Sequence, residues 1–425
     1  MQAKFSKNDV IVIGQSGGPT SVINGTAMAL VMKLKDLGAE KIYGARFGME
    51  GLLKGDFYDL SAQSERTLRR VANTPGAALG TARHDPTKED CEQVFRIFSP
   101  MGTTHFFYIG GDDSARGTLK LHNFFQDAGY TLKAYHLAKT IDNDLKLHHH
   151  TPGFGSAALY VVNTLLGARY DLDSDPKLYI VVTMGKDAGF IATAASLMSV
   201  VCDRGPDKIY VPEVRFSMDG FLGDAENLLS SGRSGLMVVS EGIWSELQYN
   251  EKKGKTVHKT IIETIGADNK GGDGFGGVTL SGGELAIHLA GKVQQQLHTK
   301  KVRADALGYP QRSSFASKVD AREAEAVGFE AAIHALSGAQ SGSVALLPFN
   351  EREGMATHLV SLEEVGNGKR EMPAEFLSPG GNYIDVANFT DYALPLVGGK
   401  RALRPMASLE PKFFHVDLQE EKIRA

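Results

Sequence analysis

The sequence predicts an α/β protein built on doubly wound parallel sheets, and two observations carry this prediction. Runs rich in β-forming residues end in glycine or acidic turns, as in HFFYIGGDD from His105 and KLYIVVTMGKD from Lys177. Between such runs, apolar residues return every three or four positions, as from Leu30 to Leu37, which is the period of a helix with one buried face. Strand, loop and helix in alternation are typical of parallel sheets that bind ligands beyond the carboxyl ends of their strands.

Composition and charge exclude several classes of protein. The chain has 425 residues, 42% hydrophobic and 23% charged, which excludes a disordered, collagen-like or coiled-coil protein. At about 150 residues per domain, this length predicts two or three domains. The formal net charge of -4 leaves no excess of cations to neutralise a phosphate backbone, so we expect no nucleic-acid partner.

The cysteines and the apolar runs bear on the compartment. The chain has two cysteines, Cys91 and Cys202, which match no disulfide framework or paired zinc spacing, and this favours a reducing compartment. No apolar run approaches the roughly 18 residues of a membrane span, and the first one is too short for a signal peptide. We therefore expect a soluble, cytoplasmic protein without a membrane partner.

The first loop of the alternation is GQSGGPTSVING from Gly14, which includes Gly17 and Gly18. It follows a strand and opens a helix, so backbone N–H groups at the start of that helix could bind an anion. The loop matches neither the GxxxxGK[ST] pattern nor GxGxxG. A tight turn without a ligand remains the alternative interpretation.

The second and third loops add carboxylates and a lysine. In YIGGDDSARG, Asp112 and Asp113 follow a strand and precede a helix, where they could hold Mg²⁺ or merely cap the helix. In AKTIDNDL, Lys139, Asp142 and Asp144 lie within six residues. These residue types suit a phosphate-binding cation, a general base and a metal or orienting group.

Three later loops carry groups suited to a phosphorylated sugar. MGKDAG, SEG and LGYPQR contribute Lys186, Glu241, Tyr309 and Arg312. Lysine and arginine suit a phosphate, whereas glutamate suits sugar hydroxyls. Taken singly, each of these charges is better explained as a solvated loop residue, whereas the three earlier anion or metal loops at three strand ends are harder to dismiss as chance.

Taken in order, the motifs GQSGGPTSVIN, GGDDS, KTIDND, TPGFGSA, MGKDAG, SEG and LGYPQR resemble the 6-phosphofructokinase family, specifically its pyrophosphate-dependent branch. The match spans roughly residues 10 to 335. The resemblance implies two Rossmann-like doubly wound lobes of the phosphofructokinase type, with the active site in the cleft between them. It predicts a donor-binding lobe over 1–153, a sugar-phosphate lobe over 154–310, and a return segment with a C-terminal extension over 311–425.

The implied activity is reversible, Mg²⁺-dependent phosphoryl transfer from pyrophosphate to the 1-hydroxyl of fructose 6-phosphate. By resemblance, Asp142 is the general base, Thr140 and Asp144 orient the site and its Mg²⁺, and Asp112 binds the metal. Gly17 and Gly18 let the donor phosphates approach the backbone. The arginine of LGTAR, Arg83, resembles the donor-side arginine of the family.

The acceptor pocket is likewise implied by resemblance. Its predicted lining is Thr140, Ile141, Asp142, Met184, Gly185, Lys186, Glu241, Tyr309 and Arg312. Arg303 is similar to an arginine that reaches the 6-phosphate from a neighbouring subunit, which implies a homodimer or homotetramer. Lys177 stands where the ATP-dependent enzymes have a second phosphate-binding arginine, and Lys186 replaces an arginine usual in this motif. A lysine keeps the charge but loses the bidentate fork.

Two positions predict the donor. ATP-dependent members have glycine where this chain has Asp113 and Lys139, which leaves space for the α-phosphate of a nucleotide. A carboxylate at 113 would fill that space and repel the phosphate, whereas Lys139 adds positive charge where the leaving group becomes negative. The alternatives are an ATP-dependent kinase of the family and a non-catalytic subunit that senses sugar phosphate.

Two segments have no predicted role. Residues 266–283 are rich in glycine and interrupt the alternation, as an inserted or tightly turned loop would. The last 90 residues, 336–425, carry no motif of the family.

Overall fold

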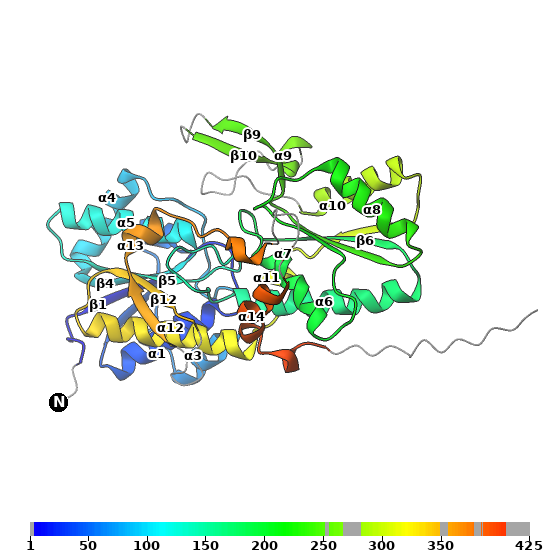
Figure 1. Cartoon of the computed structure of the whole chain (residues 1–425). Coiled ribbons are helices and arrows are strands. Elements are labelled where there is room, and N and C mark those ends of the chain that lie inside the picture. Colours follow the sequence, from blue (N-terminus) through cyan, green and yellow to red (C-terminus); the bar gives the residue numbers. More distant parts are fainter. Residues whose placement is uncertain are drawn as a thin grey trace, which may run out of the picture.

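Figure 1 shows two lobes, each organised around its own sheet, in a computed structural model of the chain. The structure describes residues 4–250, 255–266, 282–348, 356–377, 384 and 386–404. Most of the glycine-rich stretch 266–283 and the last 21 positions therefore lie outside the described residues.

The first lobe holds a seven-stranded sheet in the order β13-β12-β5-β4-β1-β2-β3. Its five central strands pair in parallel, whereas β13 and β3 close the two edges as antiparallel strands. In chain order the strands are β1 (Val10–Gln15), β2 (Lys41–Ala45), β3 (Phe57–Asp59), β4 (Thr103–Gly110), β5 (Lys133–Ala138), β12 (Gly342–Leu346) and β13 (Thr357–Val360).

The second lobe holds a four-stranded, wholly parallel sheet in the order β11-β6-β8-β7. Its strands are β6 (Leu178–Thr183), β7 (Lys208–Tyr210), β8 (Gly235–Ser240) and β11 (Val302–Ala306). A separate antiparallel hairpin, β9 (Trp244–Asn250) with β10 (Lys255–Thr260), stands at the top of Figure 1.

Helices connect the strands and cover both faces of each sheet. The α-helices are α1 (Ile23–Asp36), α2 (Met49–Lys54), α3 (Glu65–Ala72), α4 (Lys88–Met101), α5 (Asp112–Asp127), α6 (Phe154–Ser174), α7 (Phe190–Ala194), α8 (Met218–Ser230), α9 (Ile261–Thr264), α10 (Gly282–Gln296), α11 (Pro310–Ser313), α12 (Lys318–Leu336), α13 (Leu362–Gly366) and α14 (Val386–Leu396). Three short 3₁₀ helices are η1 (Ala195–Val200), η2 (Ala374–Phe376) and η3 (Lys400–Ala402).

Side-chain alternation along the strands builds the cores. In β1, Ile11 and Ile13 face α1 and α12, while Val12 between them faces α4 and α5. In β6, Val181 joins the core under α6 and Val182 joins the core under α8 and α10. Because strand neighbours point to opposite faces, a strand buried on both faces reads as a continuous apolar run. The predicted α/β class with parallel sheets is confirmed.

The chain beyond residue 311 returns to both lobes. Helix α12 packs against α1, and β12 adds itself in parallel to β5 of the first sheet. Farther along, Phe389 and Leu396 of α14 enter the core of the second lobe. In Figure 1 the yellow α12 lies beside α1 in the first lobe, and the red α14 lies near the junction of the lobes. The proposed boundaries at 153/154 and 310/311 stay predictions.

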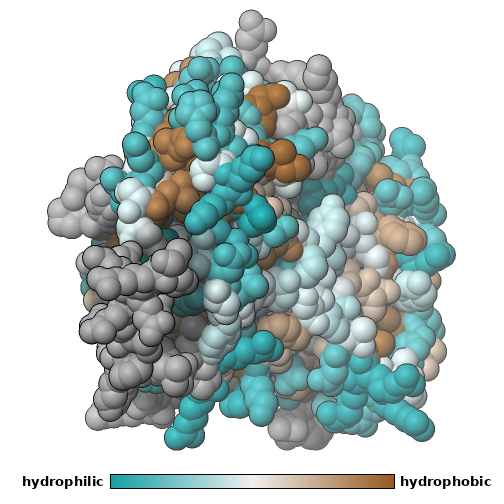
Figure 2. Space-filling view, turned by 90° about the vertical axis from the view of Figure 1, so that its right-hand side faces the viewer, coloured by the Kyte–Doolittle hydropathy of each residue, from teal (hydrophilic) through white to brown (hydrophobic). Residues whose placement is uncertain are grey.

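The visible surface of the second lobe is typical of a globular protein. The face of the second lobe in Figure 2 is mostly hydrophilic, with hydrophobic side chains in small groups. Cys91 and Cys202 are buried and unpaired, so both act as small apolar core residues. Among the residues that the structure describes, no helix combines the length and the apolar character needed to cross a membrane.

A buried carboxylate, Asp320 of α12, fixes the start of α6 at the junction of the two lobes. It accepts hydrogen bonds from the backbone N–H of Gly153, at 2.8 Å, and of Ser156, at 2.9 Å, and from the Ser156 hydroxyl. Helix N-termini leave N–H groups without partners inside the helix, and a carboxylate is their strongest acceptor. Asp320 thus ties the return helix to the junction of the lobes.

We predict that Asp320→Ala will destabilise the protein, because these buried donors would lose their acceptor. The expected loss is about 1–3 kcal/mol of unfolding free energy, visible as a lower thermal midpoint in circular dichroism. Glu325→Ala, at an exposed position of the same helix, is the matched control and should leave the midpoint unchanged. Equal midpoints for the two variants would show that Asp320 does not hold this junction.

Candidate active site

The candidate site is formed where the carboxyl ends of parallel strands from both lobes face each other. In the first lobe, β1 leads to Gly17 and Gly18, β4 to Asp112 and Asp113, and β5 to Lys139, Thr140, Ile141, Asp142 and Asp144. In the second lobe, β6 leads to Met184, Gly185 and Lys186, β8 to Glu241, and β11 to Tyr309 and Arg312. This is where doubly wound sheets place their ligands.

One cavity of about 410 Å³ joins most of these side chains. Its lining includes twelve of the predicted site residues: Gly17, Gly18, Arg83, Lys139, Thr140, Ile141, Asp142, Met184, Lys186, Glu241, Tyr309 and Arg312. Pro19, Thr20 and Thr81 complete it. The cavity therefore spans both lobes and has cationic, anionic and hydroxyl groups in its wall.

Close packing around Gly18 shapes the donor side of the cavity. A β-carbon at Gly18 would lie 2.5 Å from the Arg312 guanidinium, so a larger residue here would displace that side chain. Gly17 has φ +73°, a left-handed backbone that also favours glycine. The Lys139 ammonium donates a 2.7 Å hydrogen bond to the Gly18 carbonyl. The first loop is thus a tight turn that brings two cations to its backbone.

The cations of the donor side lie close together, which changes their acidity. Burial, followed by the charge of Arg312, lowers the pKa of Lys139 to about 7. Burial and the charge of Arg83 also lower the pKa of Arg312. The Nε atom of Arg312 and the hydroxyl of Thr20 are buried and have no hydrogen-bond partner. Such a cluster is suited to a polyanion, which would pair with the unsatisfied donors and offset the repulsion.

A left-handed residue, Asn143, arranges the KTIDND turn. Its φ is +61°, and its side-chain amide donates to the Tyr392 hydroxyl at 2.7 Å. Asparagine tolerates this backbone conformation better than most residues. The turn presents Asp142 to the cavity, with the Asp142 N–H donating to the Thr140 hydroxyl at 3.1 Å. Burial raises the pKa of Asp142, although nearby ammonium groups, first that of Lys186, oppose this rise.

The acceptor side combines a second carboxyl group with a strained lysine. Burial, followed by the charge of Asp142, raises the pKa of Glu241 to about 8. Lys186 has φ +38°, which is unusual for a residue other than glycine and is common at functional sites. The Met184 N–H donates to the Gln311 side chain at 3.2 Å, which joins β6 to α11.

Asp112 and Asp144 lie beside the cavity lining and share a cation. The Lys369 ammonium is 3.2 Å from Asp112 and 3.9 Å from Asp144. Burial, and then the charge of Asp112, raises the pKa of Asp144 well above its usual value. Burial disfavours the charged form of Lys369, but the carboxylates of Asp112, Asp187 and Asp144 outweigh this effect and raise its pKa.

Asp112 and Asp144 are suited to bind a divalent cation, because the Lys369 ammonium already lies where their carboxylates converge. Among the described residues, no group of three His, Cys, Asp or Glu side chains forms a cage for a metal ion. Two carboxylates completed by substrate phosphates are the usual surroundings of Mg²⁺. The arrangement of Asp112 and Asp144 is of this open kind.

Besides Asp112, Asp144 and Gly185, three more predicted residues are absent from the cavity lining. The Asp113 carboxylate is paired with the Arg116 guanidinium, and the predicted filling of donor space by Asp113 is not seen in the lining. Lys177 precedes β6 and pairs with Asp171 and Asp175, each at 3.3 Å. Arg303 is exposed at the amino end of β11. Since β6 and β11 run in parallel, Lys177 and Arg303 lie at the end of the sheet opposite the cavity of their own chain.

Sequence reasoning missed Lys369 and Asp187. Asp187 belongs to the MGKDAG motif and follows Lys186 directly, so that motif was the available signal. Its carboxylate lies 2.7 Å from the Lys369 ammonium. Lys369 lies in the final 90 residues, where no motif marks it. Thr20 and Thr81 also went unpredicted, although both stand within or next to quoted motifs.

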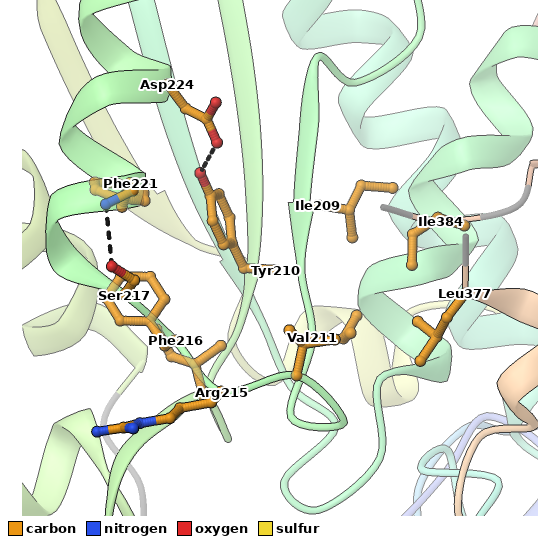
Figure 3. A pocket seen from close by; sticks show the side chains of 13 residues that line it. Ile209, Tyr210, Val211, Arg215, Phe216, Ser217, Phe221, Asp224, Leu377 and Ile384 are labelled. Carbon is orange, nitrogen blue, oxygen red and sulfur yellow. Dashed lines mark hydrogen bonds between the residues drawn. The ribbon is translucent and has the colours of Figure 1, made fainter. Parts of the chain in front are cut away.

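A second cavity, of about 320 Å³, lies in the second lobe between the β7–α8 region and the segment of Leu377 and Ile384 (Figure 3). Its wall is mainly apolar, and the Tyr210 hydroxyl donates to Asp224 at 2.7 Å. It contains none of the predicted site residues. The phosphate-directed groups therefore belong to the cavity between the lobes.

Comparison with known proteins agrees with this geometry. The pyrophosphate–fructose 6-phosphate 1-phosphotransferase of Rhodospirillum rubrum is 35% identical over 395 residues, which cover 91% of this chain and 94% of the relative. A sulfofructose kinase of Alkalicoccus urumqiensis is 32% identical, over 76% of this chain and 79% of the relative. The crystal structure of a pyrophosphate-dependent phosphofructokinase from Nitrosospira multiformis superposes with a TM-score of 0.78 at 27% identity, covering 93% of each chain.

The family match covers most of the chain, including all the strand-end loops described above. Residues 10–335 match the family described as phosphofructokinase. This span runs from β1 through α12 and so includes both sheets except β12 and β13. The chain belongs to the phosphofructokinase family.

Proposed function

We propose that this protein transfers a phosphoryl group reversibly between pyrophosphate and the 1-hydroxyl of fructose 6-phosphate. The observation that carries the proposal is the cavity between the lobes, in which Asp142 lies between a cationic donor side and a polar acceptor side. The name of the Rhodospirillum rubrum relative supports the same reaction.

The donor side suits pyrophosphate through Lys139. Its buried ammonium, next to Arg312 and at the Gly18 carbonyl, would pair with the phosphate that leaves. Positive charge at that place would stabilise the negative charge that develops on the leaving group. Asp113 would contribute by its charge beside Asp112 rather than by filling the cavity.

Asp142 is proposed as the general base. Its carboxylate would accept the proton of the sugar 1-hydroxyl while the hydroxyl oxygen attacks the donor phosphorus and the bond to the leaving phosphate breaks. Thr140 holds the Asp142 backbone in place through its hydroxyl. Catalysis would then consist mainly of positioning and charge neutralisation.

Asp112 and Asp144 would hold the divalent cation, which we propose is Mg²⁺. When bound, Mg²⁺ would neutralise phosphate charge and hold the donor in line with the acceptor. Asp144 is nearly buried, with 9% of its side chain exposed, and Asp112 begins α5. Both carboxylates therefore have fixed positions at the edge of the cavity.

We further propose that Arg303 and Lys177 act on the acceptor phosphate of a neighbouring subunit. Both face away from the cavity of their own chain, and Arg303 makes hydrogen bonds only to nearby backbone carbonyls among the contacts described. A homodimer or homotetramer would bring them to a second cavity. The charged side chains of each cleft would then come from two subunits.

The direct test is the initial rate of fructose 1,6-bisphosphate formation with pyrophosphate and ATP in parallel, in the presence of Mg²⁺. We expect turnover with pyrophosphate and little with ATP. Turnover with ATP alone would overturn the donor assignment. Binding of fructose 6-phosphate without product from either donor would instead favour a sensing subunit. Sulfofructose belongs in the assay as a second acceptor, because a relative is named for it.

Asp142→Asn should lower kcat by about 10²–10⁴-fold, since general base catalysis contributes on this order. The KM for fructose 6-phosphate should change little, because the amide keeps the size of the side chain. Burial raises the pKa of Asp142, so the wild-type rate should fall with acidification at a higher pH than for an exposed aspartate. A near-normal kcat in the variant would remove Asp142 from this role.

Glu241→Gln tests whether the acceptor side works with a neutral carboxyl group. With a pKa of about 8, Glu241 is protonated near neutral pH and can donate a hydrogen bond to a sugar hydroxyl. Above this pH it ionises beside Asp142 and a phosphate dianion, so the wild-type KM for fructose 6-phosphate should rise on the order of tenfold by about pH 9.5.

The glutamine variant cannot ionise, so its KM should stay level over the same range at saturating donor. Parallel KM profiles for the two proteins would contradict this assignment of Glu241.

A further inference from the structure

Lys369 connects the three acidic loops of the cleft. Its ammonium lies 2.7 Å from Asp187 of the second lobe and 3.2 Å from Asp112 of the first, with Asp144 at 3.9 Å. Asp112 and Asp144 are the carboxylates proposed above to hold the divalent cation. The chain thus supplies its own cation at the place where these metal ligands converge.

The backbone of Lys369 and of the residue after it is held against the loop that contains Asp144. Lys369 pairs with Leu145 in an antiparallel bridge, and the Arg370 N–H donates to the Asp144 carbonyl at 2.8 Å. The Arg370 guanidinium donates to the His149 carbonyl and lies 4.9 Å over the Phe190 ring. These contacts aim the Lys369 side chain at the acidic loops.

The contact differs from an ordinary surface ion pair. Exposed pairs contribute little, because water screens them and the side chains lose freedom. Lys369 and Asp187 are 42% and 56% exposed, but Asp112 and Asp144 are only 19% and 9% exposed, so the mutual repulsion of these two carboxylates is poorly screened. Lys369 offsets that repulsion when no other cation is present.

We propose that Lys369 is a positioning residue that keeps the metal site closed to free divalent cations. Its ammonium must leave Asp112 and Asp144 before a metal ion can bind them, and this competition weakens the binding of the metal alone. A metal ion that arrives with pyrophosphate brings negative charge with which the displaced ammonium can pair. The site would therefore select the metal–pyrophosphate complex. This inference rests on the proposed function.

The test measures metal binding rather than activity. Mn²⁺ alone is titrated into the full-length protein without donor or acceptor, and free Mn²⁺ is followed by electron paramagnetic resonance. Lys369→Met should bind Mn²⁺ more tightly than the wild type, on the order of tenfold, because the competing cation is gone. A variant that is merely damaged would lose affinity rather than gain it.

Three further variants separate the causes. Lys369→Arg keeps a cation and should bind Mn²⁺ as weakly as the wild type. Lys54→Met removes the ammonium of an exposed pair with Glu50 and should also match the wild type. Adding Asp112→Asn to Lys369→Met should abolish the gain, which locates the metal ion at Asp112.

Two results would overturn the proposal. One is Mn²⁺ binding by Lys369→Met that is equal to or weaker than that of the wild type, including no detectable binding by either. The other is a gain of the same size in Lys369→Arg, because charge would then not be the cause. Failure of the proposed function would appear separately, as absence of pyrophosphate-dependent turnover in the wild type.

Discussion

The cleft depends on charged side chains that stabilise one another, because burial by itself disfavours each of these charges. Lys139, Asp144 and Glu241 are buried and Asp142 is partly buried, and burial is the largest influence on the pKa of each. An isolated buried charge costs several kcal/mol, so such groups persist only where they face opposite charges, hydrogen-bond partners or a ligand. Two parallel sheets that point their carboxyl ends at one gap provide this arrangement.

The chain beyond residue 311 contacts both lobes and links them. Helix α12 joins the first lobe to the start of α6 through Asp320, and β12 completes the first sheet. The same part of the chain later brings Lys369 to the acidic loops and Tyr392 to the KTIDND turn. Residues without any recognisable motif therefore complete the charge balance of motif-bearing loops.

Much of the fold and of the site followed from local pattern. Continuous apolar runs predicted the buried parallel strands, and the residues directly after β1, β4, β5, β6 and β8 predicted the loops that meet in the cleft. The local pattern did not predict that the Arg116 guanidinium, one turn later on α5, pairs with the Asp113 carboxylate, whose part in donor choice stays a prediction. Such a competition between neighbours depends on side-chain geometry that residue types alone do not reveal.

The sequence by itself determined the alternation of strands and helices, the identity of the strand-end residues and the family resemblance, because these depend on periodicity and on residues adjacent in the chain. Only the tertiary structure decided that Arg312 lies over Gly18 and that Lys369 reaches Asp112, contacts between residues more than two hundred positions apart. It also decided that Lys177 and Arg303 face away from their own cavity. Such relations depend on how two sheets pack across a gap, and no local pattern encodes that packing.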